Sequence, residues 1–388
     1  MLGVGMRARF CSALAASGLL AGLVVALPEA APGGESDSFL GSLRAPTLVA
    51  STVPVTGPAA GDQNPYGVAV VPRSVGELVR NRVLVSNFNA AGNLQGTGTT
   101  IMQVDPRTNS SSVFAQISPA SVPGCTGGVG LTTALAVFRE GWVVVGSLPV
   151  TNAGQGAPAA GCLIVLNSEG AAVETITGPT VNGAPLINGP WDMTAVEHGG
   201  DATLFVTNVL NGISAATPTS PVSGGTVVRV RLELSRVRIP RVAEMRVIAE
   251  GISIRPDPNA LVVGPTGVGL EGDTLYVADS VNSQILAVRN AFDRSTATTA
   301  QVISAGNNLN DPLGMTIAPN GNIITANGNN GDVVETTVTG AQIATATLDT
   351  NNGGGGNLFG LALAPNDRGL YFVDDFSSDN SLFLAPGE

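Results

Sequence analysis

The amino-acid sequence predicts an all-β protein, a six-bladed β-propeller with four-stranded blades. Two segments near the end of the chain, residues 312–327 and 358–374, repeat one pattern: a short apolar strand, a turn with Pro-Asn, and a second strand. Their anchor glycines, Gly314 and Gly360, are 46 residues apart, which is typical of a propeller blade. Glycine accounts for 50 of 388 residues and charged residues for only 12%, as expected for a protein of sheets and turns.

The same pair of strands recurs four more times toward the start of the chain. Each pair is followed by a third apolar run and usually by a fourth, so six units of four strands are expected. The six strand pairs span residues 65–87, 131–147, 190–208, 265–279, 312–327 and 358–374.

The ring is expected to close with a strand taken from the other end of the propeller. The last unit has only three strands and ends with the apolar residues 382–384. The segment from Thr47 to Val53 precedes the first complete unit and can supply the missing outer strand. This pairing would remove two exposed sheet edges. The propeller domain is therefore predicted over residues 46–388.

The start of the chain has the pattern of a secretory signal peptide. Arg7 and Arg9 precede an apolar stretch over residues 10–27, and small residues follow at Ala26 and Ala30. We predict a signal peptide over residues 1–30 and a flexible Pro/Gly/Ser-rich linker over 31–45. The protein is then secreted or periplasmic, as in bacterial export, with no membrane span in the mature chain. An uncleaved membrane anchor is the alternative.

Two cysteines remain after removal of the predicted signal peptide, Cys125 and Cys162. In an oxidising compartment an even pair predicts one disulfide. Two unpaired buried thiols are the alternative.

Composition and motif context exclude several functions. A formal charge of −11 and the absence of lysine argue against nucleic-acid binding and against lysine catalysis. The string from Gly267 to Gly272 matches a dinucleotide motif, but a strand follows it where a helix is required. The sole histidine, His198, stands in a predicted exposed turn without partners for a catalytic triad or a metal.

The segment 278–285, Ala-Asp-Ser-Val-Asn-Ser-Gln-Ile, resembles the core of NHL repeats. Residues 327–333 and 374–382 are looser versions of it. The mature chain as a whole resembles the NHL and SMP-30/gluconolactonase-like group of six-bladed propellers, most closely in its last three blades. This resemblance implies the fold, while members of such a group bind and catalyse different things.

Oxygen-bearing side chains end all six second strands. They would form a ring at one mouth of the channel, suited to a hard cation such as Ca²⁺. The resemblance implies a divalent metal held by a Glu with Asn and Asp, but Asn64-Pro65 stands where that Glu is expected. The favoured interpretation is structural, because such side chains also accept hydrogen bonds from turn amides. The six residues are Asn87, Ser147, Asn208, Asp279, Asn327 and Asp374.

Six arginines alternate with apolar residues in the third unit, which places them on one face of outer strands. They are expected to act as charged gatekeepers of an exposed edge. A polyanion or partner site is the alternative. The residues are Arg229, Arg231, Arg236, Arg238, Arg241 and Arg246.

The connections between second and third strands are long in the first three units: residues 88–98, 148–161 and 209–225. Insertions on one face of a repeat protein often mark its binding side. The main prediction is therefore a secreted, monomeric, non-catalytic propeller without a cofactor. Its rim, including Asn87, Ser147 and Asn208, would bind an unknown protein or small-molecule ligand.

Two alternatives remain for the function. The first is an SMP-30-like, metal-dependent lactonase or hydrolase with Ca²⁺ held by Asn208, Asp279, Asn327 and Asp374. The second is a structural protein of the cell envelope. No catalytic side chain is assigned from the sequence.

Overall fold

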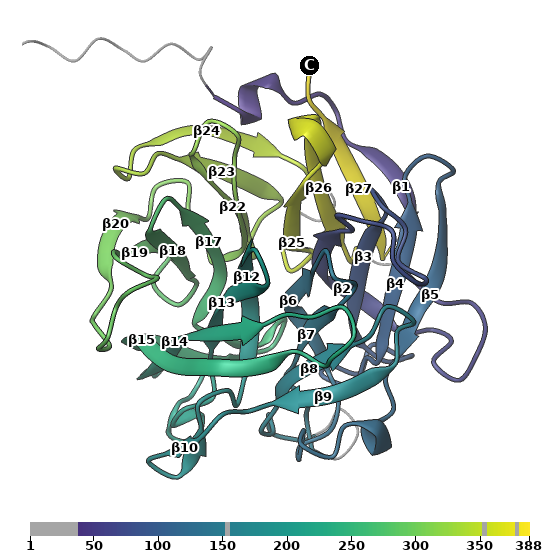
Figure 1. Ribbon diagram of the computed structural model, residues 1–388. Coiled ribbons are helices and arrows are strands. Elements are labelled where there is room, and N and C mark those ends of the chain that lie inside the picture. The colour runs from purple at the N-terminus through teal and green to yellow at the C-terminus, as the bar shows by residue number, and fades with distance from the viewer. Residues whose placement is uncertain (1–37, 152–155, 351–354, 377–379) are drawn as a thin grey trace, which may run out of the picture. The chain divides into compact units, whose positions relative to one another are not determined.

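The computed structural model describes residues 38–151, 156–350, 355–376 and 380–388. In it, six β-sheets surround a central axis, which confirms the predicted six-bladed propeller (Figure 1). The predicted signal peptide, residues 1–30, lies outside the described residues. Within the described part of the chain, no helix is long and apolar enough to cross a membrane.

Five blades are formed by consecutive antiparallel strands, in the order of the chain. Blades 1 and 2 comprise β2 (Gln63–Val70), β3 (Val83–Asn89), β4 (Thr100–Asp105), β5 (Ser110–Gln116), β6 (Leu131–Val137), β7 (Val143–Ser147), β8 (Cys162–Leu166) and β9 (Ala172–Ile176). Blades 4 and 5 comprise β17 (Pro265–Glu271), β18 (Thr274–Asp279), β19 (Gln284–Val288), β20 (Gln301–Ala305), β21 (Pro312–Ile317), β22 (Ile323–Asn327), β23 (Asp332–Thr336) and β24 (Gln342–Thr347).

Blade 3 departs from the expected four strands by gaining a fifth. The chain turns after Asp257, and β16 pairs antiparallel with Arg255–Asp257, the final residues of the long outer strand. This blade comprises β12 (Pro190–His198), β13 (Asp201–Asn208), β14 (Val222–Glu233), β15 (Arg241–Asp257) and β16 (Leu261–Val263). Short elements lie in the connections: β10 (Thr180–Val181), β11 (Ala184–Pro185) and the 3₁₀ turns η2 (Leu40–Ser42), η3 (Pro119–Ser121), η4 (Ile213–Ala215) and η6 (Pro365–Asp367).

Blade 6 is closed by a strand from the start of the propeller, as the sequence predicts. Strand β1 (Thr47–Ser51) pairs antiparallel with β27 (Ser381–Pro386), outside β26 (Gly369–Asp374) and β25 (Leu358–Leu363). Figure 1 shows β1 beside β27, although they come from opposite ends of the chain. The pairing holds the ring together through main-chain hydrogen bonds.

The first strand of each blade faces the centre of the ring (Figure 1). Adjacent first strands approach closely at a repeated glycine. A Cβ atom on Gly314 would overlap the carbonyl oxygen of Phe359, and one on Gly360 would overlap that of Tyr66. Only glycine therefore permits the packing of the ring at these positions.

The Cys125–Cys162 disulfide is present and buried, with a Cα–Cα distance of 5.3 Å. Cys125 lies in the crossover before β6, and Cys162 begins β8 at the end of the longest loop between second and third strands. The bond thus braces the loop-rich rim of blade 2. Loops of this kind are long in blades 1 to 3 and short in blades 4 and 5, as predicted.

Four arginines of the blade 3 cluster make ion pairs: Arg229, Arg231, Arg241 and Arg246. Arg229 is buried and donates to the carbonyl oxygen of Ala291 and to Glu244. Arg246 also pairs with Glu244, at 2.9 Å. These contacts favour a structural role over a free polyanion-binding surface.

The described part of the predicted linker, residues 38–45, docks on blade 5 through one buried carboxylate. Glu335 accepts hydrogen bonds from the Ser38 hydroxyl at 2.8 Å and the Leu40 amide at 2.9 Å. The amides of Asn320 and Asn322 bind its other oxygen. Burial alone would raise the pKa of Glu335, but these hydrogen bonds outweigh it, and the net pKa lies below the usual value of 4.5.

Replacing Glu335 by Gln should lower the free energy of unfolding by about 2 kcal/mol at neutral pH, because charge-assisted hydrogen bonds are lost. The folded-state pKa is depressed, so the stabilisation is present above about pH 4.5 and fades as the pH falls through the lower folded value. Urea unfolding across this pH range measures it. The exposed Glu250 provides the control, since Glu250→Gln should change little. A Glu335→Gln penalty that persists unchanged at acid pH would contradict this explanation.

Candidate functional site

The six strand-end residues are buried and bonded to nearby backbone, rather than arranged as a free ring of oxygens. Asn208 accepts from the amides of Asn188 and Gly189, at 3.3 and 3.4 Å. Asp279 accepts from the backbone and side chain of Asn282. These contacts hold turns and crossovers within blades 3 and 4.

The other four residues make contacts of the same kind. Asn327 accepts a hydrogen bond from the Asn310 amide, and Asp374 accepts one from the Phe376 amide. Asn87 donates to the Thr52 carbonyl, and the Ser147 hydroxyl accepts from the Gly130 amide. Since Asn87, Ser147 and Asn208 are fully buried, they do not form an exposed binding rim.

A divalent metal held by Asn208, Asp279, Asn327 and Asp374 does not fit these hydrogen bonds. Each of these side chains already holds a turn or crossover through at least one of its oxygens. Among the described residues, no group of three or more His, Cys, Asp or Glu side chains could hold a metal ion. We therefore derive no chemical step through a metal.

The mouth of the channel on the loop-rich face is filled by side chains. The ring of Tyr66 stacks on Phe88 and Phe359, with centroid distances of 4.5 and 4.0 Å. The β15–β16 hairpin packs on this stack, and its Val262 carbonyl accepts a hydrogen bond from the Trp191 indole. Gln95 of blade 1 fastens the hairpin tip by donating to the Pro258 carbonyl.

Acidic groups lie around the closed mouth. Burial, reinforced by Asp257, raises the pKa of Asp311 to about 7. Burial, reinforced by Asp374 and Asp349, raises the pKa of Asp375 to about 8. Neither Asp311 nor Asp375 is among the residues that line the cavity of the channel.

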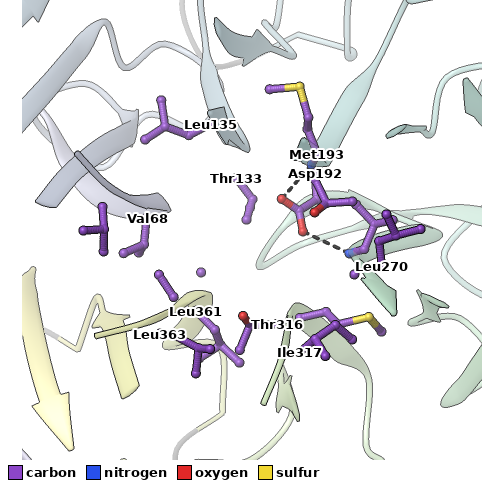
Figure 2. A pocket seen from close by; sticks show the side chains of 17 residues that line it. Val68, Thr133, Leu135, Asp192, Met193, Leu270, Thr316, Ile317, Leu361 and Leu363 are labelled. Atoms are coloured by element: carbon purple, nitrogen blue, oxygen red, sulfur yellow. Dashed lines mark hydrogen bonds between the residues drawn. The ribbon is translucent and has the colours of Figure 1, made fainter. Parts of the chain in front are cut away.

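A cavity of about 360 Å³ lies farther along the same channel. It is lined by all six first strands, mainly by their C-terminal halves, whereas the aromatic stack lies at their starts. Figure 2 shows Val68, Leu135, Leu270, Ile317 and Leu361 around it. A cavity of this size suits a small ligand.

Asp192 is the only ionisable side chain among the described residues that line this cavity. One carboxylate oxygen accepts from the Met193 amide at 2.8 Å, and the other from the Val268 amide at 3.1 Å (Figure 2). The hydroxyl of Thr207 accepts from the backbone amide of Asp192, which fixes the position of the residue. Burial raises the pKa of Asp192 to about 7, because the two amide bonds only partly offset desolvation.

The sequence analysis did not identify Asp192, although the repeat contains a signal for it. Strand pairing aligns Met193 with Val68, Val268, Met315 and Leu361. The preceding residue is glycine in blades 1, 4, 5 and 6 and aspartate in blade 3. At this position blades 1, 4, 5 and 6 have glycine and blade 2 has Ala134, so the carboxylate of blade 3 is the departure from the repeat that marks this site.

The fold and the channel carboxyl define a class: a six-bladed propeller with a small central cavity that has a buried acid, Asp192, in its lining. Comparison with solved structures supports the fold. A gluconolactonase from Xanthomonas campestris aligns with a TM-score of 0.54 at 14% identity, covering 84% of this chain and 87% of that one. Regucalcin, a calcium-binding protein from Agrobacterium tumefaciens, gives 0.53 at 11% identity, covering 89% and 94%. A putative gluconolactonase gives 0.51 at 14%, covering 89% and 92%.

No protein-family model matches the chain, and no curated protein matches it either. At such low identities the structural similarity shows the fold, and it confirms the predicted likeness to SMP-30/gluconolactonase-like propellers at that level.

The expectation of a non-catalytic binding propeller was wrong. Solved structures that share this fold are described as gluconolactonases and as regucalcin, a calcium-binding protein. Asn87, Ser147 and Asn208 of the expected binding rim are buried, so these three residues offer no exposed surface to a partner.

Proposed function

We propose that the protein is a hydrolase that opens small lactones inside the central channel, with Asp192 as the general base. The observation that carries this proposal is the Asp192 carboxyl, buried at the cavity wall with a pKa of about 7. A general base is most effective when its pKa lies near the working pH. The fold shared with proteins described as gluconolactonases supports the reaction class.

In the proposed reaction, the ionised Asp192 takes a proton from a water molecule as that water adds to the lactone carbonyl carbon. The ring C–O bond then breaks, and the proton passes from Asp192 to the departing alkoxide oxygen. The product is the open hydroxy acid. The amides of Met193 and Val268 keep the carboxylate in place throughout.

The test is hydrolysis of a panel of sugar and aliphatic lactones, followed by pH-stat titration with spontaneous hydrolysis subtracted. The Asp192 carboxyl must be ionised to act as a base, so kcat/KM should rise with pH through about 7 and then level off. Each assay is run with a chelator and again with added Ca²⁺. Activity that appears only with the metal would support the metal-dependent alternative and remove Asp192 from the central role. No hydrolysis in either condition would refute the proposed reaction.

We also propose that the protein is exported and acts as a monomer. The Cys125–Cys162 disulfide supports an oxidising compartment. Cell fractionation with mass spectrometry of the mature N-terminus, and the mass of the purified protein in solution, test these points.

A further inference from the structure

The environment of Asp192 lacks a positive charge. No salt bridge among the described residues involves it, and no described residue lining the cavity is Arg or His. Its pKa reflects only burial and the amides of Met193 and Val268, so no charged group on β6, β13 or β17 acts on it. A buried carboxylate without a cation is costly, and it gains stability when a ligand brings one.

The cavity offers further acceptors beside this carboxylate. Thr133, on the first strand of the neighbouring blade, also lines the cavity, and its buried hydroxyl has no hydrogen-bond partner among the described residues. Each first strand is the inner edge of its sheet, so one row of its backbone groups is not paired within the sheet. Each carboxylate oxygen of Asp192 accepts one amide and retains capacity for another donor.

A primary ammonium group matches this arrangement. It carries one positive charge and three donors, and it is compact enough for a cavity of about 360 Å³. The apolar side chains around the carboxylate, among them Leu135, Leu270 and Ile317, suit a short hydrocarbon body. We propose that the channel binds small primary ammonium compounds through Asp192, with the Thr133 hydroxyl as a second partner.

This proposal does not depend on hydrolysis, because binding is measured directly. Calorimetric titration compares cyclohexylamine with cyclohexanol, which has the same ring and no charge. The amine should bind and the alcohol should bind at least tenfold more weakly. Because the pKa of Asp192 is about 7, its ionised fraction falls about tenfold from pH 8 to pH 6, and the amine affinity should fall by the same factor.

Asp192→Asn should abolish the preference for the amine and its pH dependence. Asp311→Asn is the matched control, since Asp311 is another buried carboxyl with a pKa of about 7 but lies outside the cavity. It should leave both properties unchanged. Equal affinity for amine and alcohol, equal amine affinity at the two pH values, or unchanged amine binding by Asp192→Asn would each overturn the proposal. If the parent protein binds the amine as expected but hydrolyses no lactone, only the proposed reaction is refuted.

Discussion

Asp192→Asn should lower kcat for lactone hydrolysis by about 100-fold or more, the range that general-base catalysis contributes. Asparagine has the same size and can still accept a hydrogen bond from the Val268 amide, but it cannot take a proton from water. The loss should be expressed in kcat more than in KM, because the base acts mainly in the transition state. The residual rate should also lose the dependence on a group with a pKa of about 7.

The folded state should tolerate this substitution. A thermal melt of Asp192→Asn should show only a modest fall, because the loss of one accepted amide bond is partly offset by removal of a desolvated carboxyl. Asp311→Asn serves again as the control and should keep full activity, since Asp311 lies at the closed mouth. Equal losses of activity in the two variants would show that any buried charge matters and would contradict a specific role for Asp192.

Gly314→Ala should destabilise the propeller by about 3 kcal/mol, the upper part of the range for forcing extra volume into a packed interior. The added Cβ would overlap the carbonyl oxygen of Phe359 on the neighbouring first strand. This obstacle is backbone, so relief requires β21 and β25 to separate. Such a shift would disturb the ring on the side that holds the cavity.

Denaturant unfolding of this variant measures the loss. Gly200→Ala is the matched control, because the nearest atom to its added Cβ is the Leu234 carbonyl oxygen at 3.7 Å and its backbone needs no positive φ. The control should change the free energy of unfolding by less than about 1 kcal/mol. If Gly314→Ala and Gly200→Ala lower the free energy of unfolding equally, the repeated glycine is not needed for the close approach of neighbouring first strands.

The strand pairs could be predicted because a blade is a local structure. Apolar runs such as the one in β22, and turns such as the one after Ala318, repeat with nearly constant spacing. The closing strand β1 followed from counting, since the last unit lacked one strand. The fifth strand of blade 3 was missed, because the apolar run from Leu261 to Val263 is too short to be distinguished from the first strand that follows it.

The strand-end residues show where local reasoning stops. The sequence placed Asp279 and Asn327 correctly at the ends of second strands, and it favoured bonds to turn amides while keeping a cation as the alternative. The hydrogen bonds from Asn282 and Asn310 favour turn amides. That choice depends on the orientation of side chains, which a repeat pattern does not specify.

The sequence by itself determined the six blades, their order, the closing strand and the cysteine pair. These features rest on periodic burial and chain continuity, which leave a direct record in residue spacing. Only the tertiary structure shows which end of the channel is filled by side chains, and that Asp192 lies in the lining of the open part. Tyr66, Trp191 and the β15–β16 hairpin meet only after the ring has closed. Closure also desolvates Asp192, because its carboxyl is enclosed by first strands that lie far apart in the chain.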